Sequence, residues 1–238
     1  MKHQANDDGE DTAVNRLFAR LFKKKDTMTD ISILGTGNMA KALAARAIAA
    51  GRTLQIQARD EAKAAALAAE LGHGVTSAAL SEAPAGRLVI AALPFDAIVE
   101  YAKAQGAALA GKVLVDLSNP VDFSTFDALT VPADSSAAQI IAAASAAPVV
   151  KAFNTTFAGP LAAGEGQGAP LDVFVAADDA EAAALVSAFI ADAGLRALPV
   201  GGLHHARELE GMQLLVMAMQ VNEALPAFQW GTALKVLG

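Results

Sequence analysis

The chain has 238 residues, enough for one large α/β domain or for a nucleotide-binding domain with a small second lobe. Its net charge of −7 argues against a nucleic-acid partner, and the absence of cysteine excludes disulfides, cysteine zinc sites and a cysteine nucleophile. Hydrophobic residues make up 54% and aromatic residues only 5%, so we expect a closely packed, helix-rich core.

The N-terminal residues stand outside the pattern that follows them, and residues 1–28 are predicted to be a disordered or accessory extension. Within them, Thr12 to Lys25 has apolar residues at helical spacing and five positive charges without an acid. This segment is either a surface-binding helix or an extension upstream of a natural start at Met28. The sequence has neither a signal-peptide pattern nor a strongly apolar run of about 18 residues, so we expect a cytoplasmic protein without a membrane partner.

From Thr29 the periodicity alternates between strands and helices, which predicts parallel strands with right-handed crossovers. The predicted strands cover residues 31–35, 53–58, 73–76, 87–93, 112–116, 148–153, 171–177 and 195–200. The predicted helices cover residues 38–50, 60–71, 95–108, 135–146, 179–193 and 205–224. The fold class is therefore α/β: a Rossmann-type, doubly wound, mostly parallel sheet with helices on both faces and a small helical C-terminal extension. Gly159 to Pro170 is the longest predicted flexible loop, either a lid or a plain surface connection.

The turn after the first strand is Gly35-Thr36-Gly37-Asn38-Met39-Ala40, which fits the pattern Gly-x-Gly-x-x-Gly/Ala. Gly35 permits the sharp turn, Gly37 lets a pyrophosphate approach the backbone, and Ala40 lets the helix pack on its strand. The N–H groups and the positive dipole end of the helix then face the phosphates. With a strand before it and a helix after it, this turn predicts a dinucleotide site.

The end of the second strand indicates which dinucleotide binds. Sites that prefer NAD carry an acidic residue about 20 residues beyond the glycines, whereas this chain has Gln57-Ala58-Arg59. Arg59 offers a planar fork suited to a 2′-phosphate, and Lys63 lies one helical turn away, so NADP is predicted over NAD. The alternative is that Asp60 caps the next helix while Arg59 and Lys63 are solvated surface residues.

Ligands of open α/β sheets bind beyond the carboxyl ends of the strands. We expect Leu93-Pro94 beside the adenosine and ribose, Asn119-Pro120 beside the nicotinamide, and Asn154-Thr155-Thr156 beside the carboxamide or the acceptor. Asp96 is predicted to cap a helix rather than to catalyse. His204-His205 is not expected to bind a metal, because adjacent side chains at the start of a helix diverge.

Several of these segments stand in the order found in a known family. They are Gly35 to Ala40, Ala58-Arg59 with Lys63, Leu93-Pro94, Val115 to Pro120, Lys151 to Thr155 and Leu203-x-x-Ala206-Arg207-x-x-Glu210. From about Thr29 to its end, the chain resembles the coenzyme F420-dependent NADP oxidoreductase family. The Ser-Asn-Pro and Ala-Phe-Asn-Thr segments also resemble the NADPH-binding domain of the STEAP metalloreductases, which use a flavin.

The resemblance implies that Thr36 to Met39 hold the pyrophosphate, Arg59 and Lys63 the 2′-phosphate, and Leu93 and Ala152 the rest of NADP. It implies an enzyme that transfers a hydride between NADP(H) and coenzyme F420. It also implies a homodimer, which the apolar helix Glu208 to Leu225 would suit. Ala58 departs from the family, which usually has serine there, and the missing hydroxyl should weaken the preference for NADP.

No catalytic residue is predicted, because hydride transfer between stacked rings needs positioning and exclusion of water rather than acid–base groups. FMN, FAD or another small acceptor in place of F420 remains an alternative, as does a non-catalytic NADP sensor. We expect a roomy, apolar acceptor pocket lined by Asn119, Pro120, Asn154 and Thr155, and closed by Leu203 and the tail around Trp230. The predicted domains are a Rossmann NADP-binding domain over residues 29–157 and a C-terminal α/β extension over residues 158–238, which completes the sheet and this pocket.

Overall fold

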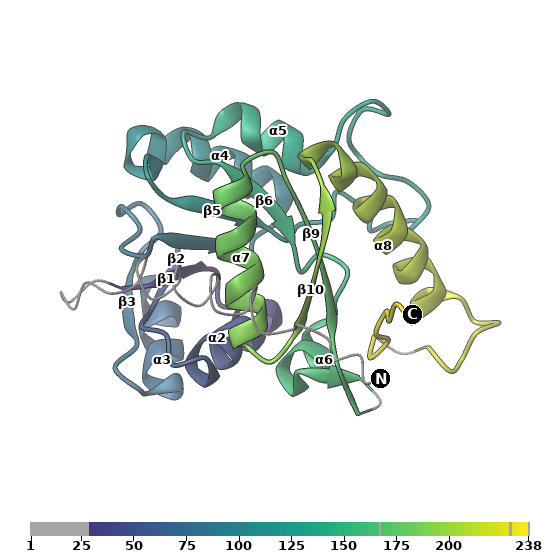
Figure 1. Ribbon diagram of the computed structural model, residues 1–238, viewed down its shortest axis with the longest axis horizontal. Coiled ribbons are helices and arrows are strands. Elements are labelled where there is room, and N and C mark those ends of the chain that lie inside the picture. Colours follow the sequence, from purple (N-terminus) through teal and green to yellow (C-terminus); the bar gives the residue numbers. More distant parts are fainter. Residues whose placement is uncertain (1–28, 167, 229, 238) are drawn as a thin grey trace, which may run out of the picture.

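The computed structural model describes residues 29–166, 168–228 and 230–237 of the chain. Over these residues a central sheet carries helices on both of its faces, so the predicted Rossmann-type α/β class is confirmed (Figure 1). The predicted N-terminal extension, with its basic segment Thr12 to Lys25, lies outside the described residues. None of the described helices is long and apolar enough to cross a membrane.

The sheet has eight strands within the described part of the chain, in the order β10-β9-β6-β5-β4-β1-β2-β3. Strands β1 to β6 run parallel, and β1 lies between β2 and β4, which makes the neighbourhood of β1 the topological switch point. The strand bounds are β1 Ile31–Leu34, β2 Leu54–Ala58, β3 Thr76–Ala79, β4 Leu88–Ala91, β5 Val113–Asp116, β6 Val149–Ala152, β9 Asp172–Ala177 and β10 Arg196–Gly201.

The last two strands of the sheet reverse the direction of the others. β9 pairs antiparallel with β6, and β10 pairs parallel with β9, so right-handed parallel crossovers do not extend to the end of the chain. Because of the reversal, the first residues of β9 and β10 lie at the edge where β1 to β6 have their carboxyl ends. Sequence periodicity locates these strands, but it carries no information about their direction.

Except for α6, the helices lie where the periodicity predicts them, with ends that differ by a few residues. Their bounds in the described chain are α2 Asn38–Ala49, α3 Glu61–Leu71, α4 Phe95–Gln105, α5 Ala137–Ala144, α6 Ala158–Ala163, α7 Ala180–Asp192 and α8 Ala206–Val221, with short 3₁₀ turns at Gly106–Leu109 and Leu203–His205. Asp60, Ser136 and Asp179 cap α3, α5 and α7 by accepting backbone N–H bonds. The predicted cap by Asp96 is wrong: α4 begins directly after Pro94, and Asp96 lies within its first turn.

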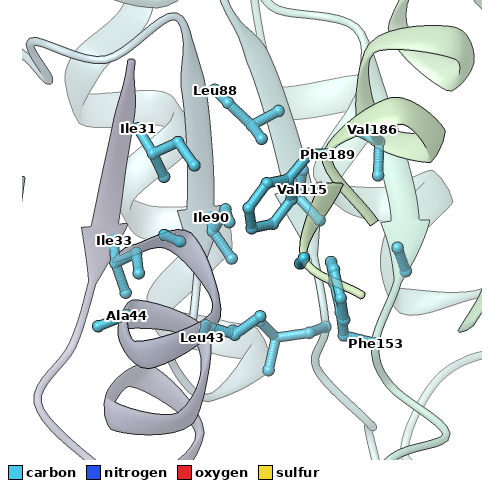
Figure 2. Packing of buried hydrophobic residues seen from close by; sticks show 14 of the residues in the cluster. Ile31, Ile33, Leu43, Ala44, Leu88, Ile90, Val115, Phe153, Val186 and Phe189 are labelled. Atoms are coloured by element: carbon cyan, nitrogen blue, oxygen red, sulfur yellow. The ribbon is translucent and has the colours of Figure 1, made fainter. Parts of the chain in front are cut away.

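Alternating side chains of the strands supply two hydrophobic layers, one on each face of the sheet. One layer packs against α2, α3 and α7, and the other packs against α4 and α5. Figure 2 shows Ile33, Ile90 and Val115 of the sheet facing Leu43 of α2 and Phe189 of α7. Full burial of one such side chain contributes about 1.5 to 3 kcal/mol, so these layers fix the positions of the strand ends.

The segment Gly159 to Pro170 is not the flexible loop that the sequence predicts. Its first half belongs to α6, which ends at Gly164 with φ 81°, and its second half forms a small hairpin of β7, Glu165–Gly166, and β8, Ala169–Pro170. Pro160 fits because the first turn of a helix needs no N–H donor there. Leu161 is fully buried, and α6 packs on α2. A buried anchor therefore holds a segment whose composition resembles a loop.

Residues after α8 form an irregular tail instead of continuing the predicted helix to residue 224. The tail returns to β9, where Asp172 accepts hydrogen bonds from the Nζ of Lys235 at 2.9 Å and from the backbone N of Val236 at 2.7 Å. Arg196 of β10 binds the same carboxylate through its Nε at 2.7 Å. The predicted division into domains at residues 157 and 158 stays a prediction.

Candidate functional site

The glycine turn after β1 has the geometry of a phosphate cradle. Gly35 adopts φ 111°, and a Cβ on it would lie 2.5 Å from the carbonyl oxygen of Ala92, so a larger residue would clash with the backbone. Gly37 caps α2 with extended backbone, and a Cβ there would meet no atom within 4 Å. No side chain caps the helix, and no acid occupies its first turn. The N-terminus of α2 therefore presents its N–H groups to open space, as an anion site requires.

Arg59 stands directly after β2 and lines a cavity of about 420 Å³ between α3 and α4. We call it the Arg59 cavity; its walls are Arg59, Glu61, Ala79, Leu80, Ser81, Ala97, Glu100, Tyr101, Ala104 and Gln105. The hydroxyl of Tyr101 is buried without a hydrogen-bond partner among the described residues, and burial raises the pKa of this phenol. Tyr101 is therefore a neutral side chain whose donor is unused within the described part of the chain.

Asp60 and Lys63, next to Arg59, test the alternative interpretation that Asp60 only caps α3 while Arg59 and Lys63 are solvated surface residues. Asp60 does cap α3, because its Oδ1 accepts the backbone N–H of Lys63 at 3.2 Å. The Nζ of Lys63 is exposed and lies 3.7 Å from Oδ2 of Asp60, so part of its charge is already balanced. Capping by Asp60 is thus compatible with an Arg59 that faces a cavity, and the contribution of Lys63 to a phosphate site is the weaker of the two.

Leu93 and Pro94 follow β4, next to the glycine turn. The Cδ2 of Leu93 would lie 3.4 Å from a Cβ on Gly35, which places the Leu93 side chain over the turn. Pro94 is exposed and precedes α4. Both residues therefore lie at the switch point between β1 and β4, where the predicted contact with the ribose would occur.

A second cavity, of about 430 Å³, opens beyond the ends of β5 and β6. We call it the Trp230 cavity; its walls are Asn38, Met39, Leu117, Asn119, Phe153, Asn154, Thr156, Phe157, Ala158, Gly159, Met217 and Trp230. It joins the N-terminus of α2 to α6, α8 and the tail. None of the residues that line it has an ionisable side chain, so it suits an uncharged ring.

Asn119 and Asn154 meet in this cavity, as the sequence predicts. The Nδ2 of Asn154 donates to Oδ1 of Asn119 at 3.0 Å, and the Nδ2 of Asn119 donates to the backbone O of Asn154 at 2.9 Å. A further bond, from Nδ2 of Asn154 to the carbonyl O of Leu209 at 3.2 Å, ties the pair to α8. The Oδ1 of Asn154 is buried and has no partner among the described residues.

A buried charge cluster of Asp116, Lys151 and Glu210 holds the frame behind this cavity. The Nζ of Lys151 lies 2.8 Å from Oδ2 of Asp116 and 2.8 Å from Oε1 of Glu210, and all three side chains are fully buried. Lys151 also donates to the carbonyl O of Ser118 at 2.6 Å, which fixes the turn that carries Asn119. Burial raises the pKa of Glu210, although Lys151 and the backbone N–H of Ala137 oppose this rise. The cluster therefore locks β5, β6 and α8 together.

A model of a known protein family matches part of the chain. Residues 30–120, less than half of the chain, match the model described as "NADP oxidoreductase coenzyme F420-dependent". The matched range contains the phosphate cradle, Arg59, the Leu93-Pro94 turn and Asn119, and the resemblance inferred from the motifs is confirmed.

Relatives of known sequence or structure extend the match beyond this range. The metalloreductase STEAP3 of Rattus norvegicus is 32% identical over 187 residues, which are 79% of this chain but only 37% of that protein. A putative F420-dependent NADP reductase from Arthrobacter sp. FB24 superposes with a TM-score of 0.70 at 28% identity, covering 81% of this chain and 93% of that one. A hypothetical protein from Sinorhizobium meliloti gives 0.66 at 29% identity, covering 77% and 89%.

Four of the residues predicted for the acceptor pocket and the cofactor site have side chains that do not line the Trp230 cavity. Pro120 and Thr155 are buried beside this cavity. Leu203 packs in the core layer against α4 and α5 and does not close the cavity. Ala152 is fully buried in the opposite layer, so its side chain contacts the core. Other residues line the Trp230 cavity in their place: Thr156 and Phe157, which follow Thr155, and Met217 of α8.

Sequence reasoning does not assign a role to several residues in or behind the two cavities. Tyr101 and Gln105 are one helical turn apart on α4, a spacing that marks one face but not what that face meets. Lys151 interrupts the apolar run of β6, and a lysine inside a buried strand is itself a signal for a paired charge. His204 and His205 have ring centroids 4.0 Å apart, and no metal-ligand cluster exists among the described residues.

Proposed function

We propose that the chain is an oxidoreductase that transfers a hydride between NADP(H) and coenzyme F420. The observation that carries this proposal is the arrangement at one sheet edge: a phosphate cradle, an arginine cavity on one side of it and a neutral cavity on the other. A dinucleotide with a 2′-phosphate has the matching order of a charged end, a pyrophosphate and a neutral reactive ring. The family description and the name of the Arthrobacter relative support F420 as acceptor.

The described residues fit NADP at each of its parts. The open N-terminus of α2 would hold the pyrophosphate, with Gly37 allowing close approach. Arg59 would bind the 2′-phosphate through a charge-assisted hydrogen bond, and the adenosine would lie in the Arg59 cavity near Tyr101. Ala58, where the family usually has serine, supplies no hydroxyl to this phosphate.

The Trp230 cavity would receive the nicotinamide and the acceptor ring together. When bound, NADP(H) supplies or accepts the hydride, and the protein contributes position and a dry environment. The Asn119–Asn154 pair fixes one wall, and an amide N–H placed against Oδ1 of Asn154 would satisfy that buried acceptor. Phe153, Phe157 and Met217 exclude water from the same space. No side chain of this cavity needs to exchange a proton with the substrate.

A spectrophotometric assay tests the proposal. The purified protein should oxidise NADPH in the presence of F420. The loss of NADPH absorbance measures this reaction. FMN and FAD serve as parallel acceptors, because the resemblance to the STEAP metalloreductases, to which the rat relative STEAP3 belongs, implies a flavin as the alternative. Turnover with a flavin but not F420 would move the acceptor assignment to flavins. Tight NADPH binding by calorimetry without turnover on any of the three would instead indicate a non-catalytic NADP sensor.

We also propose that two copies pair through the outer side of α8. The helix buries polar Glu210 and Gln213 inward, whereas Leu215 is 68% exposed and Val221 is 45% exposed on its outside. A second copy is the occupant that this apolar side fits, because paired copies would cover it mutually. Leu215→Glu should give a monomer by sedimentation with unchanged NADPH affinity, and Glu181→Gln, at an exposed position of α7, serves as control. A wild-type protein that sediments as a monomer would contradict the proposal.

A further inference from the structure

Aromatic residues with unusual backbone angles gather at the Trp230 cavity. Among the described residues, the non-glycine positions with positive φ are His73, Phe126, Phe153 and Trp230. Phe153 and Trp230 line the cavity, and the ring of Phe126 lies 6.0 Å from that of Trp230. A left-handed backbone is unfavourable for a bulky residue, and such positions persist where the surrounding structure over-determines them. The positive φ of Trp230 therefore indicates that the surrounding residues hold its backbone in place.

The backbone around Trp230 is attached to the body at two places. Its N–H donates to Oε1 of Gln220 on α8 at 2.7 Å, and the same oxygen accepts the hydroxyl of Thr232 at 3.1 Å. Further along the tail, Lys235 and Val236 bind Asp172 at the start of β9. The backbone that carries the indole is thus held at Trp230 itself and at the residues that follow it.

The indole ring itself is supported at an angle and remains partly open. Its centroid lies 5.5 Å from that of Phe157 at an interplanar angle of 73°, and the ring of Phe126 meets it at 60°. Both are edge-to-face contacts, which leave the two rings of a pair non-parallel. Trp230 is nonetheless 45% exposed. A rigidly held indole with free surface in a neutral cavity is suited to parallel stacking on a planar ligand.

We propose that Trp230 is the specificity-determining residue for the acceptor, against which the hydride-accepting ring stacks. This inference rests on the proposed hydride transfer at the same cavity. It favours fused, planar, electron-poor rings over small non-planar carbonyl compounds, because only a flat ring gains contact across the whole indole. Recognition by stacking also agrees with the absence of ionisable groups among the residues that line the cavity.

Kinetics of two substitutions test the role. Trp230→Leu keeps apolar volume but removes the flat surface, and should raise the acceptor KM about 5- to 100-fold, the range that loss of one aromatic stack produces. The kcat and the NADPH affinity should change much less, and Trp230→Phe should restore part of the lost affinity. Phe123→Leu is the matched control, because Phe123 is a 63% exposed aromatic residue of the same cluster that does not line the cavity.

Fluorescence supplies a readout that needs no turnover. Trp230 is the single tryptophan of the chain, so its emission reports this position alone. Titration with FMN, and separately with F420, in the presence of NADP⁺ should quench the emission saturably, at concentrations that match the KM. Free N-acetyltryptophanamide under the same conditions corrects for absorption of light by the acceptor.

Two outcomes would overturn the inference while leaving the proposed function intact. One is measurable acceptor reduction with an unchanged KM in Trp230→Leu. The other is emission that responds to protein concentration but not to acceptor, which would assign Trp230 to an interface between copies. Failure of NADPH to bind at all would instead remove the proposed function itself.

Discussion

The Arg59 cavity and the Trp230 cavity lie at the same edge of the sheet and have nearly the same volume, yet they differ in the ionisable side chains of their walls. The first contains an arginine, two glutamates and a tyrosine, whereas the second contains no ionisable side chain. Charge distinguishes ligands that differ by a phosphate, because a charge-assisted bond depends on one group. An apolar wall distinguishes ligands by shape. Under the proposed function, the charged Arg59 cavity would recognise the cofactor, and the separate Trp230 cavity would hold the reacting rings.

Removing the buried Lys151 should have the largest effect on stability. It removes the charge cluster behind the Trp230 cavity and leaves the Arg59 cavity unchanged. Lys151→Met leaves Asp116 and Glu210 without their shared cation, so the free energy of unfolding should fall by about 3 to 5 kcal/mol in urea denaturation. At low temperature, the remaining folded protein should still bind adenosine 2′,5′-bisphosphate, because the Arg59 cavity contains none of these residues.

Lys112→Met is the matched control for this substitution. Lys112 is half-buried, whereas Lys151 is fully buried, and its Nζ donates to the carbonyl O of Gly86 at 3.0 Å without a carboxylate partner among the described residues. Its replacement should cost much less. Equal losses in the two variants would show that the removed side-chain stem, rather than the uncompensated carboxylates, determines the result.

Removing Arg59 should weaken the cofactor site and leave the Trp230 cavity unchanged. Arg59→Ala deletes a charge-assisted contact of about 1.5 to 3 kcal/mol, so NADPH affinity measured by calorimetry should fall on the order of tenfold or more. Affinity for NADH and the acceptor KM should stay nearly unchanged. Lys63→Ala provides the control, with a smaller effect because Lys63 is exposed and near Asp60. Equal weakening of both dinucleotides would mean that Arg59 acts through the fold.

The smallest expected effect comes from the tail that closes the Trp230 cavity. Burial alone raises the pKa of Asp172, but hydrogen bonds from Arg196, Val236 and Lys235 outweigh it and leave the pKa below the ordinary value of 3.8. A depressed carboxylate pKa adds stability above the unfolded pKa, and this stability is lost as the pH falls through the folded pKa. Asp172→Asn should therefore lower the free energy of unfolding by about 1 kcal/mol at neutral pH.

Two measurements check the role of Asp172. The stability difference between wild type and Asp172→Asn should shrink as the pH is lowered below about 4. Trp230 emission should change in the variant, while binding of adenosine 2′,5′-bisphosphate should not. A difference in stability that is constant from pH 7 to pH 3 would contradict the assignment of the charge contacts.

Local patterns predicted the half of the molecule around β1 and β4 well. The glycine turn depends on residues adjacent in sequence, and Asn119 meets Asn154 because parallel strands bring their carboxyl ends to one edge. The direction of β9 and the closure of the cavity by Met217 depend on contacts between distant segments, which periodicity does not encode. The sequence predicts a loop at α6 because glycine, proline and alanine dominate this segment. The burial of Leu161 instead determines its helical structure.

The reversed direction of β9 has a consequence for the timing of the reaction. It brings Asp172 to the ligand edge, so the last residues of the described chain are fastened there by side-chain contacts rather than by a sheet ladder. Releasing a few such contacts requires far less free energy than opening the sheet, and regions of this kind exchange amide hydrogens by local opening. Under the proposed function, local opening of this wall would let the reduced acceptor leave while the dinucleotide stays bound.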